Sequence, residues 1–281
     1  MAILDKFYTK QNIAKQCISF LRDVCPEINE DSKFLEPSAG NGSFSKQLSN
    51  CLALDIEPED ESIQKQDFYT FNSSYTGYIT IGNPPFGKRS KTAIDFFNIA
   101  AKYSEVIAFI VPVSFMKWSV QKELNKEFKL VDYFYLEDNS FLDRDKDFSV
   151  RTVFQVWKRN SEIDKRLKKA PPIKHDDFDI WQYNATPAAE KTIDEDWEIA
   201  TYRQGYHNYN ELFTRLDYDT IKEKMLGAKK QQFFFIKPKN NEVKEKILRM
   251  DFNALAERNT STPGFGKGDF VSYYTELYGV D

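Results

Sequence analysis

The sequence contains few residues of the kinds that bind metals or form disulfides. Its 281 residues include three cysteines and two histidines. Cys17, Cys25 and Cys51 lack the spacing of metal ligands, and an odd number of cysteines cannot all pair. His175 and His207 are too few for a histidine-rich site. We therefore expect a reducing compartment and a site without a metal ion.

Long apolar runs are also missing. The first ten residues, MAILDKFYTK, contain no apolar segment of the kind found in signal peptides. No apolar run elsewhere is long enough to cross a bilayer. These absences predict a cytoplasmic protein with no membrane partner.

An excess of positive charge is absent as well. Lysine and arginine total 39 residues against 43 aspartates and glutamates, which gives a net charge of −4. A strongly basic chain would have indicated nucleic-acid binding, and this balance counts against it. Any contact with phosphate must therefore depend on local basic patches.

The sequence does contain enough apolar residues for a core, at 41% of the chain. Up to about Arg159, short apolar runs alternate with stretches of helical spacing, which predicts an α/β fold with a parallel sheet and crossover helices. The expected strands are Lys33–Glu36, Leu52–Asp55, Tyr78–Gly82, Val106–Pro112, Leu130–Leu136 and Arg151–Lys158. The expected helices are Gln11–Val24, one over residues 92–101 capped by Thr92, and one over residues 114–128 capped by Ser114.

The composition changes after Trp157. Residues 158–172 are strongly charged and end in a Pro-Pro pair, which is typical of a surface linker. We therefore expect one domain over residues 1–160 and a smaller α+β accessory region over residues 161–281. Apolar runs at Ile199–Tyr202 and Gln232–Ile236 predict short strands in this second part.

A turn rich in small residues follows the first expected strand. Phe34–Phe44 reads FLEPSAGNGSF, so an apolar strand leads into a turn and then into an expected helix. Small residues let the backbone approach a ligand, and a helix N-terminus offers free N–H groups. Glu36 would repel the pyrophosphate of a dinucleotide, but it suits the cationic methionine part of S-adenosylmethionine. The glycines also depart from G-x-G-x-x-G, and the alternative is an ordinary strand-to-helix turn. The candidate cofactor residues here are Glu36, Pro37, Ser38, Ala39 and Gly40.

Two further acidic residues follow expected strands. Asp55 lies 15 residues after Gly40, at a strand end where a carboxylate can accept both hydroxyls of a ribose. An aspartate in such a place is otherwise a turn or cap residue. Asp67 and Phe68 follow the next short run, where they can bind the amine of an adenine ring and cover its face. Alone, this pair is weak support for a cofactor site.

A second motif, Asn83-Pro84-Pro85-Phe86, lies between two glycines after the strand Tyr78–Gly82. The prolines remove two backbone donors, so the loop presents carbonyl oxygens with few competing N–H groups. With the side-chain oxygen of Asn83, two acceptors can hold both hydrogens of a planar exocyclic amine. Phe86 offers a face on which a base can stack, at about 1–3 kcal/mol. The alternative, a plain Pro-Pro turn, does not explain Asn83 or Phe86.

Together, Glu36–Gly42 and Asn83–Phe86 resemble the paired signature of class I adenine-N6 methyltransferases, in the group whose cofactor motif comes first and whose target-recognition region is C-terminal. The resemblance covers residues 5–159. It implies a Rossmann-like seven-stranded sheet, S-adenosyl-L-methionine as cofactor, and direct methylation of a flipped-out adenine, in DNA rather than RNA. Residues 1–160 are then the catalytic domain, and residues 161–281 the accessory or target-recognition region.

The resemblance also assigns roles outside the two motifs. Residues 5–10 are similar to a segment that contributes to the cofactor site, here through Phe7, Tyr8 and Thr9. Lys10 departs from the family, which often has proline at this position. A second aromatic wall of the base pocket is expected at Phe141 or Phe148.

Basic residues mark candidate contacts with the nucleic acid. Lys88, Arg89 and Lys91 follow the catalytic loop, where backbone phosphates should pass. Arg203 lies in a polar, aromatic turn that can reach base edges. Further candidates, which are as often solvated helix faces, are the linker patch 165–169 and the stretch 222–246 with Phe233, Phe234 and Phe235.

Several alternatives stay open. The same catalytic loop serves adenine in RNA or a glutamine amide in protein, although Asn83 with Phe86 favours adenine over glutamine and cytosine-N4 targets. A cofactor-binding partner subunit without catalysis is another alternative, and no nuclease cluster is apparent. The sequence does not predict the recognition sequence, a cognate restriction enzyme or the oligomeric state.

Overall fold

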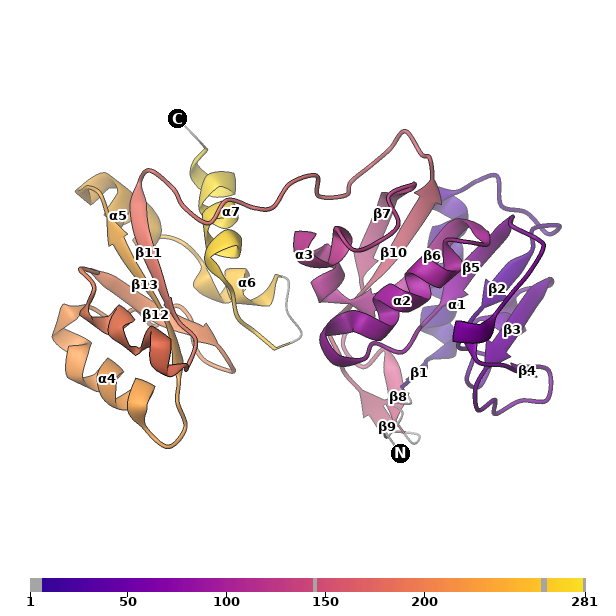
Figure 1. Cartoon of the computed structure of the whole chain (residues 1–281), viewed down its shortest axis with the longest axis horizontal. Helices are drawn as coiled ribbons and strands as arrows, with labels where there is room; N and C mark the ends of the chain where they lie inside the picture. The colour runs from indigo at the N-terminus through magenta and orange to yellow at the C-terminus, as the bar shows by residue number, and fades with distance from the viewer. Residues whose placement is uncertain (1–6, 144–145, 259–261, 280–281) are drawn as a thin grey trace. The chain divides into compact units, whose positions relative to one another are not determined.

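The computed structural model describes residues 7–143, 146–258 and 262–279 (Figure 1). The chain divides into two compact units, Met1–Lys168 and Lys169–Asp281. The division lies within the charged segment, residues 158–172, that the sequence indicated as a linker. We call the two parts unit 1 and unit 2.

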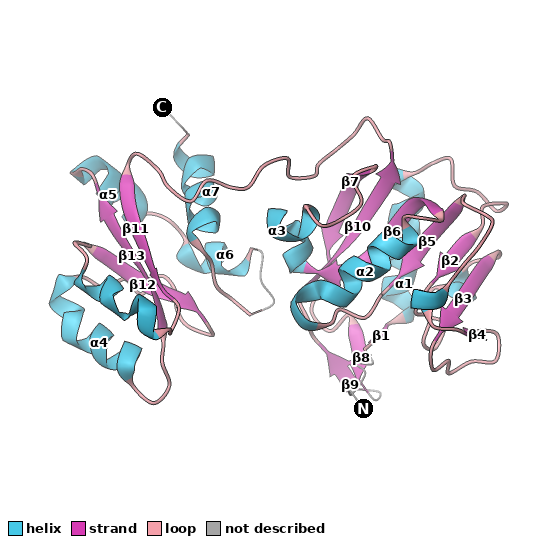
Figure 2. Cartoon of the chain, in the orientation of Figure 1, coloured by secondary structure: helices cyan, strands magenta, loops and turns pink. Residues whose placement is uncertain are grey.

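Unit 1 is built on a seven-stranded sheet in the order β4-β3-β2-β5-β6-β10-β7 (Figure 2). Strands β4, β3, β2, β5 and β6 are parallel, whereas β10 is antiparallel to both of its neighbours. This is the Rossmann-like seven-stranded sheet expected from the sequence, so the predicted fold class is confirmed. The strands are β2 (Phe34–Glu36), β3 (Cys51–Asp55), β4 (Gln64–Lys65), β5 (Tyr78–Gly82), β6 (Ser104–Pro112), β7 (Phe128–Tyr135) and β10 (Thr152–Arg159).

Both faces of this sheet are buried. Successive side chains of β6 alternate between two core clusters, with Phe109 in one and Ile110 in the other. Helix α2 (Lys91–Ala100) contributes to the first cluster and α1 (Gln11–Val24) to the second. Figure 2 accordingly shows the two helices on opposite faces of the sheet. Burial on both sides explains why the central strands read as continuous apolar runs.

A small antiparallel sheet in the order β1-β8-β9 holds the N-terminal segment of unit 1. Its strands are β1 (Tyr8–Thr9), β8 (Phe141–Asp143) and β9 (Lys146–Phe148). In register, Thr9 pairs with Phe141 and Phe141 pairs with Phe148. The chain before α1 is thereby tied to the loop that precedes β10.

Unit 2 contains a three-stranded antiparallel sheet in the order β11-β13-β12, formed by β11 (Phe178–Tyr183), β12 (Ile199–Gln204) and β13 (Gln232–Pro238). Its helices are α4 (Tyr218–Leu226), α5 (Asn241–Leu248), α6 (Phe252–Glu257) and α7 (Lys267–Tyr278). Phe233, Phe234 and Phe235 occupy the central strand and are fully buried. They form the core of unit 2, so the prediction that they contact nucleic acid is wrong. Among the described residues, no helix is both long and apolar enough to cross a bilayer.

Two expected helices differ from the structure in length or in their cap. In place of one helix over residues 114–128, the chain forms a 3-10 turn at Val113–Met116 and the short α3 (Trp118–Gln121). Lys117, with an extended backbone (φ −85°, ψ 140°), separates the two, and α3 itself ends at Gln121. Helix α2 begins after Ser90, which is left-handed, so Thr92 lies inside the helix and is not its cap.

The helix expected after the glycine-rich turn is also absent from the described chain. A 3-10 turn, Ser45–Gln47, takes its place. The N–H of Ser45 donates to the side chain of Glu36 at 2.8 Å. The turn therefore directs a backbone donor at the strand-end carboxyl group, without the helix N-terminus that the sequence suggested.

Candidate active site

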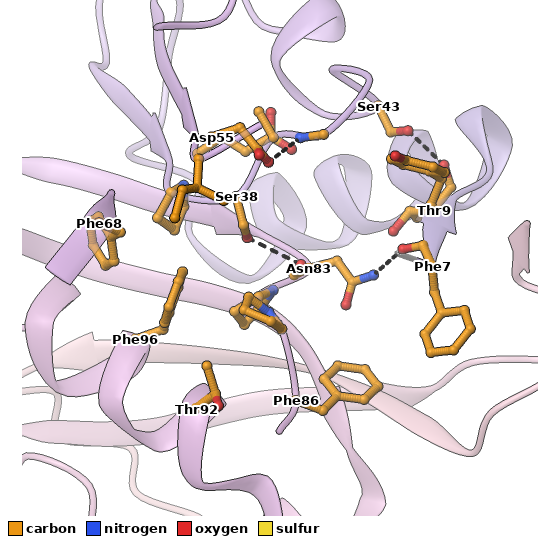
Figure 3. Close-up of a pocket in the computed structure, with 18 of the residues that line it drawn as sticks. Phe7, Thr9, Ser38, Ser43, Asp55, Phe68, Asn83, Phe86, Thr92 and Phe96 are labelled. Carbon is orange, nitrogen blue, oxygen red and sulfur yellow. Dashed lines mark hydrogen bonds between the residues drawn. The ribbon is translucent and has the colours of Figure 1, made fainter. Parts of the chain in front are cut away.

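A cavity of about 450 Å³ lies in unit 1 beyond the carboxyl ends of β2, β3 and β5 (Figure 3). The strand order reverses between β2 and β5, and open α/β sheets bind their ligands at such a reversal. The cavity brings together several segments that are far apart in the sequence. Its lining includes every predicted catalytic and cofactor residue: Phe7, Tyr8, Thr9, Glu36, Pro37, Ser38, Ala39, Gly40, Asp55, Asp67, Phe68, Asn83, Pro84, Pro85 and Phe86.

Gly40 has a backbone conformation and a neighbour that both disfavour a side chain. Its φ is +54°, and a Cβ at this position would lie 2.8 Å from Cε1 of Tyr8. Its N–H donates to Oδ2 of Asp55 at 2.8 Å, and its carbonyl accepts from the N–H of Glu59 at 3.0 Å. The glycine turn therefore lies directly against Tyr8 and Asp55.

Glu36 is a buried carboxyl group at the end of β2. Its side chain is 2% exposed, and burial raises its pKa to about 8, with a smaller contribution from the charge of Asp55. Contacts with Ser45 oppose this shift. A cation beside Glu36 would favour the ionised form, because opposite charges lower the pKa of a carboxyl group. The site is thus suited to a positively charged ligand group.

Asp55 and Asp67 differ in what their carboxylates already bind. One oxygen of Asp55 accepts from Gly40, and the other accepts from the N–H of Glu57 at 2.8 Å. Each oxygen keeps a second lone pair, so Asp55 retains acceptor capacity for ligand hydroxyls. Asp67 caps the 3-10 turn Phe68–Thr70 by accepting the N–H of Tyr69 at 2.9 Å.

Aromatic rings form one wall of the cavity. Phe68 is 2% exposed, and its ring centroid lies 5.1 Å from that of Phe96 on α2 (Figure 3). Phe96, Thr92 and Ile56 line the cavity but were not singled out from the sequence. Phe96 and Thr92 lie four residues apart on one face of α2, a spacing that could have identified them together. Ile56 directly follows Asp55 and leaves 47% of its surface exposed, which is unusual for a residue beside a buried strand.

Asn83 has one end of its amide held and the other end without a partner. Its Nδ2 donates to the carbonyl oxygen of Phe7 at 3.2 Å (Figure 3). Its Oδ1 is buried and has no hydrogen-bond partner among the described residues. A buried acceptor without a partner costs about 1–3 kcal/mol. A ligand that donates a hydrogen bond to Oδ1 would remove this cost.

The rest of the Asn83–Phe86 loop is packed against its surroundings. The Oγ of Ser38 donates to the backbone carbonyl of Asn83 at 3.2 Å, which links this loop to the glycine turn. Pro84 is buried, whereas Pro85 and Phe86 are half-buried. Gly87 has a φ of +66°, and a Cβ there would lie 2.1 Å from Oγ1 of Thr92. The loop can therefore lie close to the first turn of α2 only with glycine at position 87.

The N-terminal segment closes another side of the cavity. The hydroxyl of Tyr8 donates to Glu59, and the carbonyl of Thr9 accepts from Oγ of Ser43 at 2.7 Å. Oγ1 of Thr9 is buried without a partner among the described residues. Lys10 donates its backbone N–H to the carbonyl of Ser140 at 3.2 Å. Proline could not make this bond, which gives a physical reason against proline at this position.

The predicted nucleic-acid residues occupy different environments. Lys88 and Arg89 are exposed, and neither has an ion-pair partner within the described ranges, whereas Lys91 pairs with Asp95 at 2.9 Å. Lys88, Arg89 and Lys91 do not line the cavity, and neither does Phe148.

The two candidate aromatic walls also differ. Phe141 is 1% exposed and lines the cavity. Phe148 stacks on Phe7 instead, with ring centroids 4.1 Å apart. Arg203 belongs to unit 2, where its guanidinium donates to the side chains of Gln204 and Gln232, and burial lowers its pKa.

No protein-family model and no curated protein matches this sequence. Solved structures to which the chain is similar include PH1948 from Pyrococcus horikoshii, a proposed RNA methyltransferase, at 18% identity and a TM-score of 0.42, covering 56% of this chain and 87% of that one. Another is lmo1582 from Listeria monocytogenes, a proposed class I S-adenosylmethionine-dependent methyltransferase, at 13% identity and 0.43, covering 58% and 64%. A third is the 23S rRNA methyltransferase ErmE, at 14% identity and 0.40, covering 56% and 71%. Similarity this distant assigns neither a substrate nor a site residue.

Proposed function

We propose that unit 1 binds S-adenosyl-L-methionine in its cavity and transfers the methyl group to the N6 amine of adenine in nucleic acid, with DNA as the preferred substrate. The observation that carries this proposal is the amide of Asn83. Its Nδ2 is held by the carbonyl of Phe7, and its buried Oδ1 has no partner among the described residues. Such an oxygen requires a hydrogen-bond donor, and an exocyclic amine supplies one.

The proposed chemistry addresses the weak nucleophilicity of an aromatic amine. Its lone pair is conjugated with the ring, so the nitrogen is a weak nucleophile. Acceptance of one hydrogen by Oδ1 of Asn83, and of the other by a carbonyl of the proline pair, favours a pyramidal nitrogen whose lone pair is free. Neither Pro84 nor Pro85 has an N–H group that would compete for these acceptors. The nitrogen would gain the methyl group as its bond to sulfur breaks, which leaves S-adenosylhomocysteine, and would release one proton to water. The enzyme would form no covalent bond to the base.

The residues of the cavity fit the cofactor. S-adenosyl-L-methionine supplies an electrophilic methyl group on a sulfonium centre. Asp55 would accept the ribose hydroxyls, and Phe68 would cover the adenine ring. Glu36 and the unpartnered hydroxyl of Thr9 would bind the methionine part. We assign the cofactor roles of Phe7, Tyr8, Pro37, Ser38, Ala39, Gly40 and Asp67 on the same basis, as lining residues of the same cavity.

Substrate contacts at the cavity and beside it complete the proposal. Phe86 stacks on a flipped-out adenine, with Phe141 as the second wall, and Lys88 and Arg89 bind phosphates. Unit 2 serves as the target-recognition region. A second cavity of about 310 Å³ in unit 2 supports this role, because Tyr206, which is 84% exposed, lies at it beside His207 and Asn208. An exposed tyrosine next to amide groups suits contact with bases.

The test is methyl transfer from labelled S-adenosyl-L-methionine to unmethylated duplex DNA, RNA and protein in parallel, followed by nucleoside analysis. We expect N6-methyladenine in DNA. Label in RNA or protein alone would contradict the substrate, and no label despite cofactor binding would support a partner subunit without catalysis.

Asn83→Ala tests the role of the amide in the same assay. We expect turnover to fall by at least about 100-fold, as for loss of one preorganised hydrogen-bonding group. Cofactor affinity, measured by calorimetry, should stay close to that of the wild type. Turnover at the wild-type rate would disprove the role given to Asn83.

A further inference from the structure

We propose that Phe148 is a positioning residue: its stack on Phe7 fixes the carbonyl group that keeps Oδ1 of Asn83 directed at the substrate amine. This inference rests on the proposed function of Asn83. It gives Phe148 a role at the catalytic amide, although its ring does not line the cavity.

The first step concerns the two ends of the Asn83 side chain. The oxygen and nitrogen of an amide are nearly equal in size, so rotation by 180° would exchange an acceptor for a donor at little steric cost. The rotated side chain would point an N–H at the substrate amine and could no longer accept a hydrogen from it. It would also place Oδ1 against the carbonyl oxygen of Phe7, where two acceptors repel each other. The hydrogen bond of 3.2 Å from Nδ2 to Phe7 therefore selects the productive orientation.

The second step concerns what holds Phe7 itself. The β-ladder with β8 begins at Tyr8, which pairs with Leu142, so Phe7 lies just outside it. The ring of Phe7 stacks on Phe148 with an interplanar angle of 1° and a centroid distance of 4.1 Å. Phe148 is itself placed by β9, where it pairs with Phe141. The stack thus extends the order of the small sheet by one residue, to the carbonyl that contacts Asn83.

The same sheet offers a matched control. Lys10 and Asp147 form an ion pair of 2.6 Å that also joins the N-terminal segment to β9. Lys10 lies just after β1, at the end opposite Phe7, and the ion pair involves neither the ring of Phe7 nor that of Phe148. Asp147→Ala therefore weakens the attachment of the segment without removing the stack, whereas Phe148→Ala removes the stack and Phe148→Tyr keeps it.

The experiment compares these three variants with the wild-type full chain. Four quantities are measured: kcat, the Kd of S-adenosylhomocysteine, and the Kd of each of two oligonucleotides. The first oligonucleotide carries the adenine that the labelling experiment identifies, and the second carries unsubstituted purine, which lacks the amine, at the same position. The ratio of the two oligonucleotide affinities reports the contact between the amine and Oδ1 of Asn83.

We expect Phe148→Ala to lower kcat by about 10- to 100-fold, as small misplacements of catalytic groups do. Its Kd for S-adenosylhomocysteine and for the purine oligonucleotide should change by about twofold or less, while the preference for adenine disappears. Phe148→Tyr and Asp147→Ala should retain both kcat and the preference. The proposal would be overturned if Phe148→Ala lowered the affinity for all three ligands by the same factor, or if it left kcat unchanged. If the wild type itself shows no preference for adenine, the proposed function fails first and this inference fails with it.

Discussion

At the scale of single residues, Gly40 and Gly42 separate the effect of backbone strain from that of a steric clash. Both have positive φ, at +54° and +80°. A Cβ on Gly40 meets the ring of Tyr8 at 2.8 Å, whereas a Cβ on Gly42 meets only the flexible chain of Lys46, at 3.1 Å. Both substitutions to alanine should cost about 1 kcal/mol of stability from strain. Only Gly40→Ala should also displace Tyr8 and weaken cofactor binding by about tenfold or more, as measured by calorimetry. Equal cofactor affinities for the two variants would disprove the close packing of Tyr8 on the turn.

Glu36 should make the stability of the fold depend on pH in the direction opposite to most carboxyl groups. Its pKa is about 8 in the folded protein, above the ordinary value of 4.5, so the folded state holds a proton that the unfolded state has lost. Stability due to this group is therefore full below about pH 4.5 and is lost as pH rises to about 8. Glu36→Gln keeps an acceptor for Ser45 and should gain thermal stability relative to the wild type between pH 5 and 8.5. A difference between the two melting temperatures that does not change with pH would contradict the buried, protonated state.

The two motifs at the cavity could be found from the sequence because their residue types are required by local chemistry. The proline pair and Asn83 lie next to one another in the chain, and so do Glu36 and the glycine turn. The contact between Phe7 and Asn83 joins residues 76 positions apart, and no local pattern encodes it. The same holds for Phe148, whose stacking partner Phe7 lies just before β1, far away in the sequence.

At the scale of elements, the turn Lys88–Ser90 presents basic side chains beside the catalytic loop. Lys88 and Arg89 have no ion-pair partner among the described residues, and Arg89 adopts a left-handed conformation with a φ of 54°. Each alanine substitution of these two should weaken DNA binding for all sequences alike and reduce the slope of log K against log salt by about 0.9. Lys91→Ala is the control, because Lys91 already pairs with Asp95. Fluorescence anisotropy at several salt concentrations measures the slopes, and three equal slopes would rule out phosphate contacts at this turn.

Strands could be predicted from the sequence where burial on both faces of the sheet requires a continuous apolar run. All six strands expected in the large sheet are present, with ends shifted by two residues or fewer, because both faces of that sheet are covered. The β8-β9 hairpin was missed, since two strands of three residues carry no periodicity of their own. The helix expected over residues 114–128 was too long because apolar spacing does not reveal the extended backbone of Lys117, which separates the 3-10 turn from α3.

At the scale of the whole molecule, the division between the two units predicts where proteases cut. Arg166 belongs to unit 1, because its guanidinium donates to the carbonyl oxygens of Gln121, Leu124 and Asn125. Lys169 and Lys174 are exposed and lie in unit 2 before its first strand. Brief trypsin treatment should therefore cut first after one of these two lysines and leave two folded fragments, detectable by mass spectrometry. A first cut at Arg166 or inside either sheet would contradict this division.

The pairing of β1 with β8 also determines when, during synthesis, the cavity of unit 1 can be completed. During synthesis, Thr9 leaves the ribosome long before Phe141, the residue with which it pairs. The glycine turn and the catalytic loop can thus be made, and even packed, while the segment carrying Phe7 still has no strand to join. A nascent chain should bind neither cofactor nor substrate productively until the last strands of unit 1 have emerged, so that the proposed methylation would begin only with a completed domain.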